Sequence, residues 1–270
     1  MRMSHAITMI ILDWAGTTVD YGCFAPVDAF VSAFTYFGIT PTMEETRAPM
    51  GMPKRAHIEK MLTGKRLTAL WKETYGRPPT QKDVDKIYDQ FEPTLFEVLV
   101  SHADPLPGVL SAVAEIRGMG IAIGSTTGYT QEMMDVIVPL AKEKGYAPDC
   151  IVCPDETGGI GRPYPYMLWH NLEALGVSSI GEVLKIGDTA ADMQEGRNAG
   201  CLCVGVLEGS SMLGLSEKEL AESDQADVSA LFETADQNYR KAGADHVIKD
   251  ISALPGLIKS LNEGTLDRER

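Results

Sequence analysis

The sequence predicts an α/β fold in which a doubly wound parallel sheet is interrupted by an all-helical insert. From about residue 105 onward, short apolar runs alternate with segments of helical periodicity, a pattern typical of parallel sheets covered by helices. A similar apolar run stands near the start of the chain. Between the two lies a long stretch with helical spacing and no convincing strand. We therefore expect a core domain of residues 1–20 and 102–270 and a helical cap domain of residues 21–101.

The first expected strand covers residues 7–12. Its residues are almost all apolar, so we expect both of its faces to be buried, as they are within a parallel sheet. The run ends at Asp13, and a loop of residues 14–18 follows.

At least three helices are expected in the insert. Apolar residues recur at helical spacing over residues 27–37, and a glycine ends that helix. Pro53 can be the first residue of a second helix that runs through Leu62. Residues 84–99 carry a third helical pattern, with an interruption or kink near Pro93.

Helices and strands alternate in the rest of the chain. The expected helices are residues 109–118, 131–144, 166–175, 190–199 and 254–261, and the expected strands are residues 121–124, 150–153, 183–186, 201–206 and 246–248. This alternation predicts a Rossmann-like sheet. Ligands in such sheets lie beyond the carboxyl ends of the strands, so the residues that follow each strand are the informative ones.

Polar side chains follow four of the expected strands. In chain order they are Asp13, the run Ser125-Thr126-Thr127, Arg162, and Asp188 with Asp192 one helical turn later. Carboxylates gathered without partners repel one another, and oxygen ligands suit Mg²⁺. A hydroxyl, helix-start amides and an arginine suit a phosphoryl group. A single aspartate after a strand is commonly a helix cap, but caps do not explain four polar anchors after four strands.

The composition excludes several classes of partner. The chain has 270 residues, with 24 Lys and Arg against 38 Asp and Glu, so its formal net charge is −14. A nucleic-acid binder needs a basic footprint, and an anionic membrane attracts basic proteins. We therefore expect no nucleic-acid partner and no membrane partner. A small anionic ligand remains compatible, because a few local cations can override the global field.

The apolar segments and the cysteines predict a cytoplasmic protein. Residues 7–12 are too short for a membrane span and lack the flanks of a signal peptide. The five cysteines, an odd number, fit a reducing compartment.

Four segments of this sequence resemble the motifs of the haloacid dehalogenase superfamily. They are Asp13-Trp14-Ala15-Gly16-Thr17-Thr18-Val19-Asp20, Ser125-Thr126, Arg162-Pro163 and Gly187-Asp188-Thr189-Ala190-Ala191-Asp192. The resemblance implies a core of that superfamily's type, with Asp13 as the nucleophile that attacks phosphorus. It also implies that Ser125, Thr126 and Arg162 bind the phosphoryl group, although the adjacent Ser125, Thr126 and Thr127 leave the hydroxyl open. Mg²⁺ would be held by Asp13, Ala15, Asp188 and Asp192, with direct or water-mediated contact to Asp192 undecided.

Ala15 departs from the superfamily's phosphatases, which carry a second aspartate two residues after the nucleophile. That aspartate protonates the departing oxygen, and an enzyme without it expels an alkoxide poorly. Either this protein is inactive, or its leaving group needs no such proton.

A cap segment offers an answer to the missing acid. The run Met50-Gly51-Met52-Pro53-Lys54-Arg55-Ala56-His57-Ile58 is similar to the cap motif of phosphonoacetaldehyde hydrolases, as are the segments around Asp13 and over residues 124–130. This resemblance implies that Lys54 forms an imine with the aldehyde and that His57 assists proton transfer. Cys23, Met50, Gly51 and Tyr129 would line the substrate pocket. It also implies a homodimer, in which the phenylalanine-bearing first cap helix could pair with its copy.

An imine makes the absence of an acid at Ala15 intelligible. Cleavage of a carbon–phosphorus bond toward phosphorus transfer leaves two electrons on carbon, and a protonated imine accepts them as an enamine. Lys54 must first be neutral. Its expected position in a first helical turn, beside Arg55 and under a closing cap, favours the neutral amine. The expected reaction converts phosphonoacetaldehyde to acetaldehyde and phosphate.

Two alternatives belong to other functional classes. One is a phosphatase or dehalogenase of the same superfamily that acts on another small substrate. Ala15 argues against the phosphatase, and Lys54 argues against both. The other is a phosphate-binding protein without catalytic activity, against which the joint presence of Asp13, Arg162 and Lys54 argues.

Overall fold

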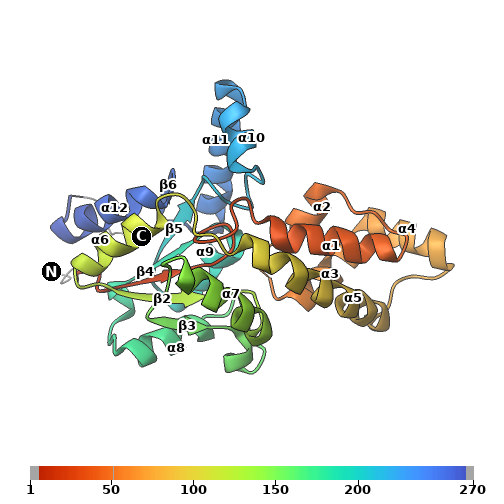
Figure 1. Ribbon diagram of the computed structural model, residues 1–270, viewed down its shortest axis with the longest axis horizontal. Coiled ribbons are helices and arrows are strands. Elements are labelled where there is room, and N and C mark those ends of the chain that lie inside the picture. The colour runs from red at the N-terminus through yellow and green to blue at the C-terminus, as the bar shows by residue number, and fades with distance from the viewer. Residues whose placement is uncertain (1–5, 51, 266–270) are drawn as a thin grey trace.

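The computed structural model describes residues 6–50 and 52–265, and its centre is a parallel sheet (Figure 1). In the described part of the chain the sheet has six strands in the order β3-β2-β1-β4-β5-β6. These are β1 (Met9–Leu12), β2 (Ala122–Thr126), β3 (Cys150–Val152), β4 (Val183–Gly187), β5 (Leu202–Val206) and β6 (His246–Ile248). The strand order runs outward in both directions from β1, which pairs with β2 and β4. The predicted doubly wound α/β fold is therefore confirmed.

Helices cover both faces of the sheet. They are α6 (Val109–Gly118), α7 (Gln131–Glu143), α8 (Tyr166–Leu175), α9 (Ala190–Ala199), α10 (Glu217–Glu222), α11 (Gln225–Ala242) and α12 (Leu254–Glu263), with short 3₁₀ turns at Val100–His102, Pro154–Thr157, Ile180–Glu182 and Ile251–Ala253. Successive side chains of a strand point to opposite faces. Accordingly Ile10 and Leu12 of β1 pack in the core that includes α6 and α12, whereas Met9 and Ile11 pack with Leu168 of α8. This two-sided burial explains the nearly continuous apolar run.

The segment between β1 and α6 forms a helical cap to one side of the sheet (Figure 1). Its helices are α1 (Phe24–Tyr36), α2 (Met43–Arg47), α3 (Lys54–Leu62), α4 (Lys65–Tyr75) and α5 (Gln81–Leu99). The stacked rings of Phe30 and Phe91, with centroids 4.3 Å apart, join α1 to α5. Pro93 lies within α5, and α3 begins one residue after Pro53. Residues 21–101 remain our proposed cap domain, and residues 1–20 and 102–270 our proposed core domain.

The two connections between sheet and cap run side by side. Val19 forms a bridge with Pro105, and the Leu106 amide donates a 2.9 Å hydrogen bond to the Thr18 carbonyl. On the outgoing connection Asp20 and Cys23 have φ values of 56° and 54°, which lie in the left-handed region. These close contacts place the cap over the carboxyl end of β1. None of the helices in residues 6–50 and 52–265 has the length and apolarity that crossing a membrane requires.

Candidate active site

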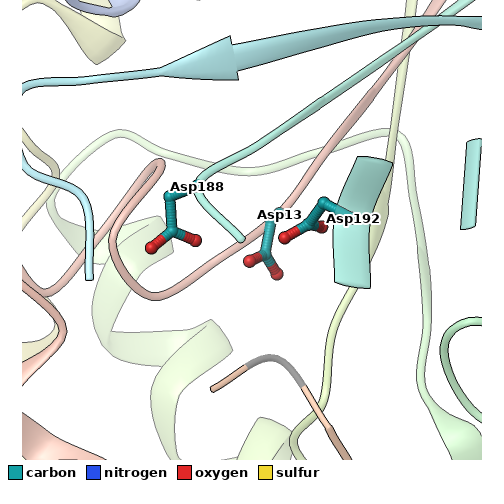
Figure 2. A group of neighbouring side chains, drawn as sticks. All are labelled: Asp13, Asp188 and Asp192. Atoms are coloured by element: carbon teal, nitrogen blue, oxygen red, sulfur yellow. The ribbon is translucent and has the colours of Figure 1, made fainter. Parts of the chain in front are cut away.

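Three buried carboxylates meet at the carboxyl edge of the sheet. Asp13 follows β1, Asp188 follows β4, and Asp192 lies in the first turn of α9. Because β1 and β4 are neighbours, these residues come together, and ligand oxygens of all three lie within 4.8 Å of one another. In the view of Figure 2 the Asp13 carboxylate lies between the other two.

Arg162 forms a buried ion pair with Asp13. Its Nη2 lies 2.7 Å from Asp13 Oδ1 and also donates to the Thr126 carbonyl at 2.8 Å. Burial alone would raise the pKa of Asp13, but the positive charges of Arg162 and Lys185 outweigh burial and hold that pKa below its ordinary value. Asp13 is therefore an anion at neutral pH, as a nucleophilic carboxylate must be.

Asp188 is held among other negative charges. Burial, followed by the charges of Asp13 and Asp192, raises the pKa of Asp188 well above its ordinary value. Its Oδ2 accepts a 2.7 Å hydrogen bond from the Ser211 amide. A Cβ at Gly16, whose φ is +82°, would stand 2.4 Å from the same oxygen, so the loop after β1 needs a glycine there.

This donor set fits a magnesium ion. Asp13 and Asp188 offer carboxylate oxygens, and Ala15, which lines the adjoining cavity, has a backbone carbonyl as its only oxygen. Burial is the main cause of the raised pKa of Asp188, and the crowded negative charge of Asp13 and Asp192 adds to it; a divalent cation would offset that charge.

Asp192 contacts two cationic side chains and caps a helix. Its Oδ1 lies 3.0 Å from Arg162 Nη2 and 2.8 Å from Lys185 Nζ. Its Oδ2 accepts hydrogen bonds from the amide and hydroxyl of Thr189, which together cap α9. Oδ2 is thus engaged in the helix cap, whereas Oδ1 lies at ion-pair distance from both cations but accepts no hydrogen bond among the described residues.

The three adjacent hydroxyls at the end of β2 have different environments. Ser125 Oγ accepts a 3.0 Å hydrogen bond from the Trp14 indole, and Thr126 Oγ1 donates to Glu195 at 2.9 Å. Only Thr127 of the three lines the cavity beside Asp13. Ser125 and Thr126, which we expected to bind the phosphoryl group, are both buried, because alternate strand residues point to opposite faces and both faces of this sheet are covered. Neither residue lines that cavity.

Two buried charged residues near the site were not predicted from the sequence. Lys185 lies in β4 and Glu195 lies in α9, and neither side chain is exposed. Two signals were available in the sequence. A lysine inside an otherwise apolar strand needs a buried anionic partner, and Glu195 lies three residues after Asp192 on the same helix face.

Lys54 reaches the site from the cap. It is the first residue of α3 and its side chain is buried, with Nζ 4.8 Å from the centre of the Tyr129 ring. Burial lowers the pKa of Lys54, and the nearby charge of Arg162 acts in the same direction. Neutral Lys54 amine is therefore accessible at a lower pH than for an exposed lysine.

Lys54 and Asp13 line the same small cavity between cap and core. Its volume is about 20 Å³, and it is lined by Asp13, Ala15, Cys23, Met50, Lys54, Thr127, Gly128, Tyr129, Arg162 and Thr189. Five residues singled out by the resemblance to the hydrolase cap and core motifs thus come together: Lys54, Cys23, Met50, Tyr129 and Asp13. Gly51, expected in the same pocket, lies outside the described residues.

His57 lies behind this cavity rather than in its lining. Its ring stacks on Phe30 with centroids 3.9 Å apart, and its Nε2 lies 2.8 Å from the Thr46 carbonyl. A carbonyl only accepts, so Nε2 carries the proton and Nδ1 has a free lone pair. Burial, with the charge of Lys54, lowers the pKa of His57 to about 3. The ring is therefore neutral at physiological pH.

The Cys23 thiol also stays protonated. It is buried at the start of α1, and burial, reinforced by the charges of Asp20 and Asp188, raises its pKa well above the ordinary value. Cys23 therefore lines the cavity as a small, mostly apolar group.

A model of the haloacid dehalogenase-like hydrolases matches residues 7–200 of the chain, and a second model of HAD hydrolase-like proteins matches residues 159–254. The chain belongs to the haloacid dehalogenase-like hydrolases. The first match covers β1 to α9, and with them Asp13, Arg162, Asp188 and Asp192.

Several relatives with high similarity to this chain are named phosphonoacetaldehyde hydrolases. The enzyme of Lysinibacillus sphaericus is 45% identical over 257 residues, covering 95% of this chain and 96% of the relative. A bifunctional phosphonoacetaldehyde hydrolase/aminoethylphosphonate transaminase of Clostridioides difficile is 44% identical over 260 residues, and this chain spans only 41% of its length.

Solved structures of other proteins share the fold. A phosphonoacetaldehyde hydrolase-like protein from Oleispira antarctica has a TM-score of 0.93 at 31% identity, covering 99% of this chain and 96% of its own. A β-phosphoglucomutase from Clostridium difficile has a TM-score of 0.66 at 14% identity, covering 97% of this chain and 100% of its own. At that identity the second likeness shows the fold alone.

Proposed function

We propose that this hydrolase cleaves the carbon–phosphorus bond of phosphonoacetaldehyde, giving acetaldehyde and phosphate. The observation that carries the proposal is that Lys54 of the cap and Asp13 of the core line one cavity, while the residue two positions after Asp13 is an alanine. The names of the relatives support the same reaction.

The first step is condensation of Lys54 with the substrate aldehyde. The neutral amine attacks the carbonyl carbon, the carbinolamine loses water to give a neutral imine, and the imine nitrogen takes up a proton from solvent to become the protonated imine. Burial of Lys54 supplies the neutral amine. Nδ1 of neutral His57 has no hydrogen-bond partner among the described residues and can accept a hydrogen bond from behind the cavity, but a ring with a pKa of about 3 is a weak base there.

The second step transfers the phosphoryl group to Asp13. A carboxylate oxygen attacks phosphorus while the carbon–phosphorus bond breaks, and its electron pair forms the enamine double bond as the iminium nitrogen becomes neutral. Arg162 and the Thr127 hydroxyl balance the phosphoryl charge. No proton is needed on the leaving carbon at this point, which agrees with Ala15 at that position.

The last steps return both residues to their starting state. The enamine carbon takes up a proton, water adds to the resulting imine, and acetaldehyde leaves Lys54. A second water hydrolyses the aspartyl phosphate and frees phosphate and Asp13. A Mg²⁺ ion held by Asp13, Asp188 and the Ala15 carbonyl would supply charge neutralisation and orientation of the phosphoryl oxygens.

The cap must open in each cycle. A cavity of about 20 Å³ holds roughly one water molecule and cannot hold phosphonoacetaldehyde. We infer that the structure represents the closed form, in which water is excluded from the reacting groups.

Borohydride trapping tests the proposal. The protein is incubated with phosphonoacetaldehyde, reduced and digested, and the mass adduct is located, with Lys54→Arg in parallel. We expect an adduct on Lys54 and release of acetaldehyde, both absent from the variant. Absence of the adduct together with phosphate release from ordinary phosphate esters would instead identify a phosphatase.

We also propose a cytoplasmic homodimer. All five cysteines are free, which fits a reducing compartment. Phe30 and Phe34 of α1 are 0% exposed inside the cap, so a pairing of this helix with its copy would use other residues of the helix. Light scattering during size exclusion measures the assembly directly.

A further inference from the structure

Lys185 and Glu195 form a charged layer directly behind the catalytic residues. Both side chains are 0% exposed, one on β4 and the other on α9. Neither lines the cavity that contains Asp13 and Lys54. The reaction proposed above gives neither residue a role.

Lys185 joins three groups of the layer. Its Nζ lies 2.8 Å from Asp192 Oδ1, 3.2 Å from Glu195 Oε2 and 2.8 Å from Thr126 Oγ1. The charge of this buried cation is offset by two carboxylates, and its ammonium donates a hydrogen bond to the Thr126 hydroxyl. Lys185 therefore fixes the separation between α9 and the end of β2.

Glu195 accepts a hydrogen bond from the Nε of Arg162. Its Oε2 accepts hydrogen bonds from Arg162 Nε at 3.2 Å and from Thr126 Oγ1 at 2.9 Å. On the other side, Arg162 Nη2 donates to Asp13 Oδ1 and the Thr126 carbonyl. A guanidinium is planar, so anchoring Nε and one terminal nitrogen fixes the plane of the whole group.

This geometry assigns the remaining terminal nitrogen of Arg162 to the ligand. The hydrogen bonds described for Arg162 engage Nε and Nη2, and the residue also lines the cavity. Nη1 is then the nitrogen left to meet a phosphoryl oxygen. Its direction depends on Glu195 rather than on the ligand.

We propose that Glu195 and Lys185 are positioning residues for phosphoryl transfer. Glu195 fixes the plane of Arg162, and Lys185 holds Glu195 and Asp192 in place while offsetting their charge. The inference rests on the proposed function, since it assumes that Arg162 binds the transferred group. It predicts that loss of Glu195 impairs phosphorus chemistry and spares imine formation, because Lys54 belongs to the cap.

Glu195→Gln is the primary test, and Glu115→Gln is the matched control. Glu115 forms a surface ion pair with Lys259 at 2.6 Å, about half exposed on both sides. For Glu195→Gln we expect kcat to fall about 10- to 100-fold, the loss typical of groups that orient a catalytic residue. Inorganic phosphate should bind correspondingly more weakly, while the borohydride adduct on Lys54 forms as in the parent protein. The control should change none of these.

A second variant pair separates positioning from folding. Lys185→Met leaves Glu195 and Asp192 paired with Arg162 alone, so their negative charge is less well offset and the Tm should fall. Adding Glu195→Gln to it removes one of those negative charges, and the Tm should partly recover. The kcat should not recover, because Arg162 still lacks its rear anchor. Recovery of Tm and kcat together would indicate a structural role alone and overturn the proposal.

Calorimetric titration with inorganic phosphate keeps the two proposals distinguishable. It needs no substrate, and the phosphate affinity that it measures depends on how Arg162 is oriented. Weaker phosphate binding by Glu195→Gln, but not by Glu115→Gln, supports the positioning role. If the parent protein released no acetaldehyde, that result would refute the proposed reaction and leave the positioning role standing. Parent-like phosphate affinity and a kcat within about twofold of the parent would overturn the positioning role.

Discussion

At the scale of single residues, the site shows how neighbouring side chains of the same chemistry acquire different roles. The consecutive hydroxyl residues 125–127 differ in their contacts. Ser125 accepts a hydrogen bond from the Trp14 indole, Thr126 donates one to Glu195, and Thr127 lines the cavity. The sequence could not distinguish them, because the choice depends on where the strand ends and on which large side chain packs against it.

Variants at these hydroxyls should separate activity from stability. Thr127→Val removes the cavity hydroxyl, so kcat/KM should fall about 10- to 100-fold, as for a lost hydrogen bond to a charged group. Because this hydroxyl also accepts a 3.1 Å hydrogen bond from the Tyr129 amide, the unfolding free energy should fall as well. Thr127→Ser should retain most activity. Ser125→Ala leaves the buried Trp14 N–H unpaired and should cost about 1–3 kcal/mol of unfolding free energy with little change in kcat. Steady-state kinetics and urea unfolding measure both effects, and the opposite pattern would restore the original assignment to Ser125.

At the scale of elements, apolar periodicity predicted the position of many helices and strands. The helices at residues 109–118, 166–175 and 190–199 and the strand at residues 246–248 have the predicted bounds. The short α2 was missed because five residues carry no usable periodicity, although its capping box of Thr42 and Glu45 was visible in the sequence. The long α11 was missed because only Val228, Ala235 and Tyr239 are buried along it.

The missed α2 turns out to connect the cap to the core. Arg47, its last residue, donates from Nη1 to the carbonyls of Gly22 at 2.8 Å and Ser211 at 3.3 Å. The Ser211 amide in turn holds Asp188. A Cβ at Gly214 would stand 2.8 Å from Arg47 Nε, so the core loop fits closely around this arginine. We infer that Arg47 stabilises the closed cap.

Arg47→Lys should weaken closure. A lysine side chain is one atom shorter than the path to Arg47 Nη1 and has no planar group to stack on Phe24, so it should lose one or both hydrogen bonds and kcat/KM should fall about 10-fold. Arg66→Lys is the matched control, because Arg66 pairs with Glu45 inside the cap. Steady-state kinetics compares the two, and equal kcat/KM losses would show that Arg47 acts on the cap's own stability and not on closure.

At the scale of the whole molecule, the topology explains why the site could be foreseen in outline. Parallel strands end at one edge, so polar residues after successive strands had to meet there. What the sequence did not reveal is the layer behind them, since Lys185 and Glu195 become partners only through the packing of α9 against β4. Around Arg162 and Lys185 stand Asp13, Asp188, Asp192 and Glu195, so the site has two more carboxylates than cations.

That excess of negative charge predicts how the protein responds to metal. Mg²⁺ at about 100 times its dissociation constant should add about 2.7 kcal/mol of stability, which for a chain of this size corresponds to roughly 5–10 °C in Tm. Asp188→Asn removes a carboxylate whose pKa is raised by burial and by its acidic neighbours, so the metal-free variant should be at least as stable as the metal-free parent at pH 7.5. The variant should lose the Mg²⁺-dependent rise, whereas Asp104→Asn, at an exposed ion pair with Lys144, should keep it. Thermal melts over a magnesium titration measure this, and an undiminished rise in Asp188→Asn would place the metal away from these carboxylates.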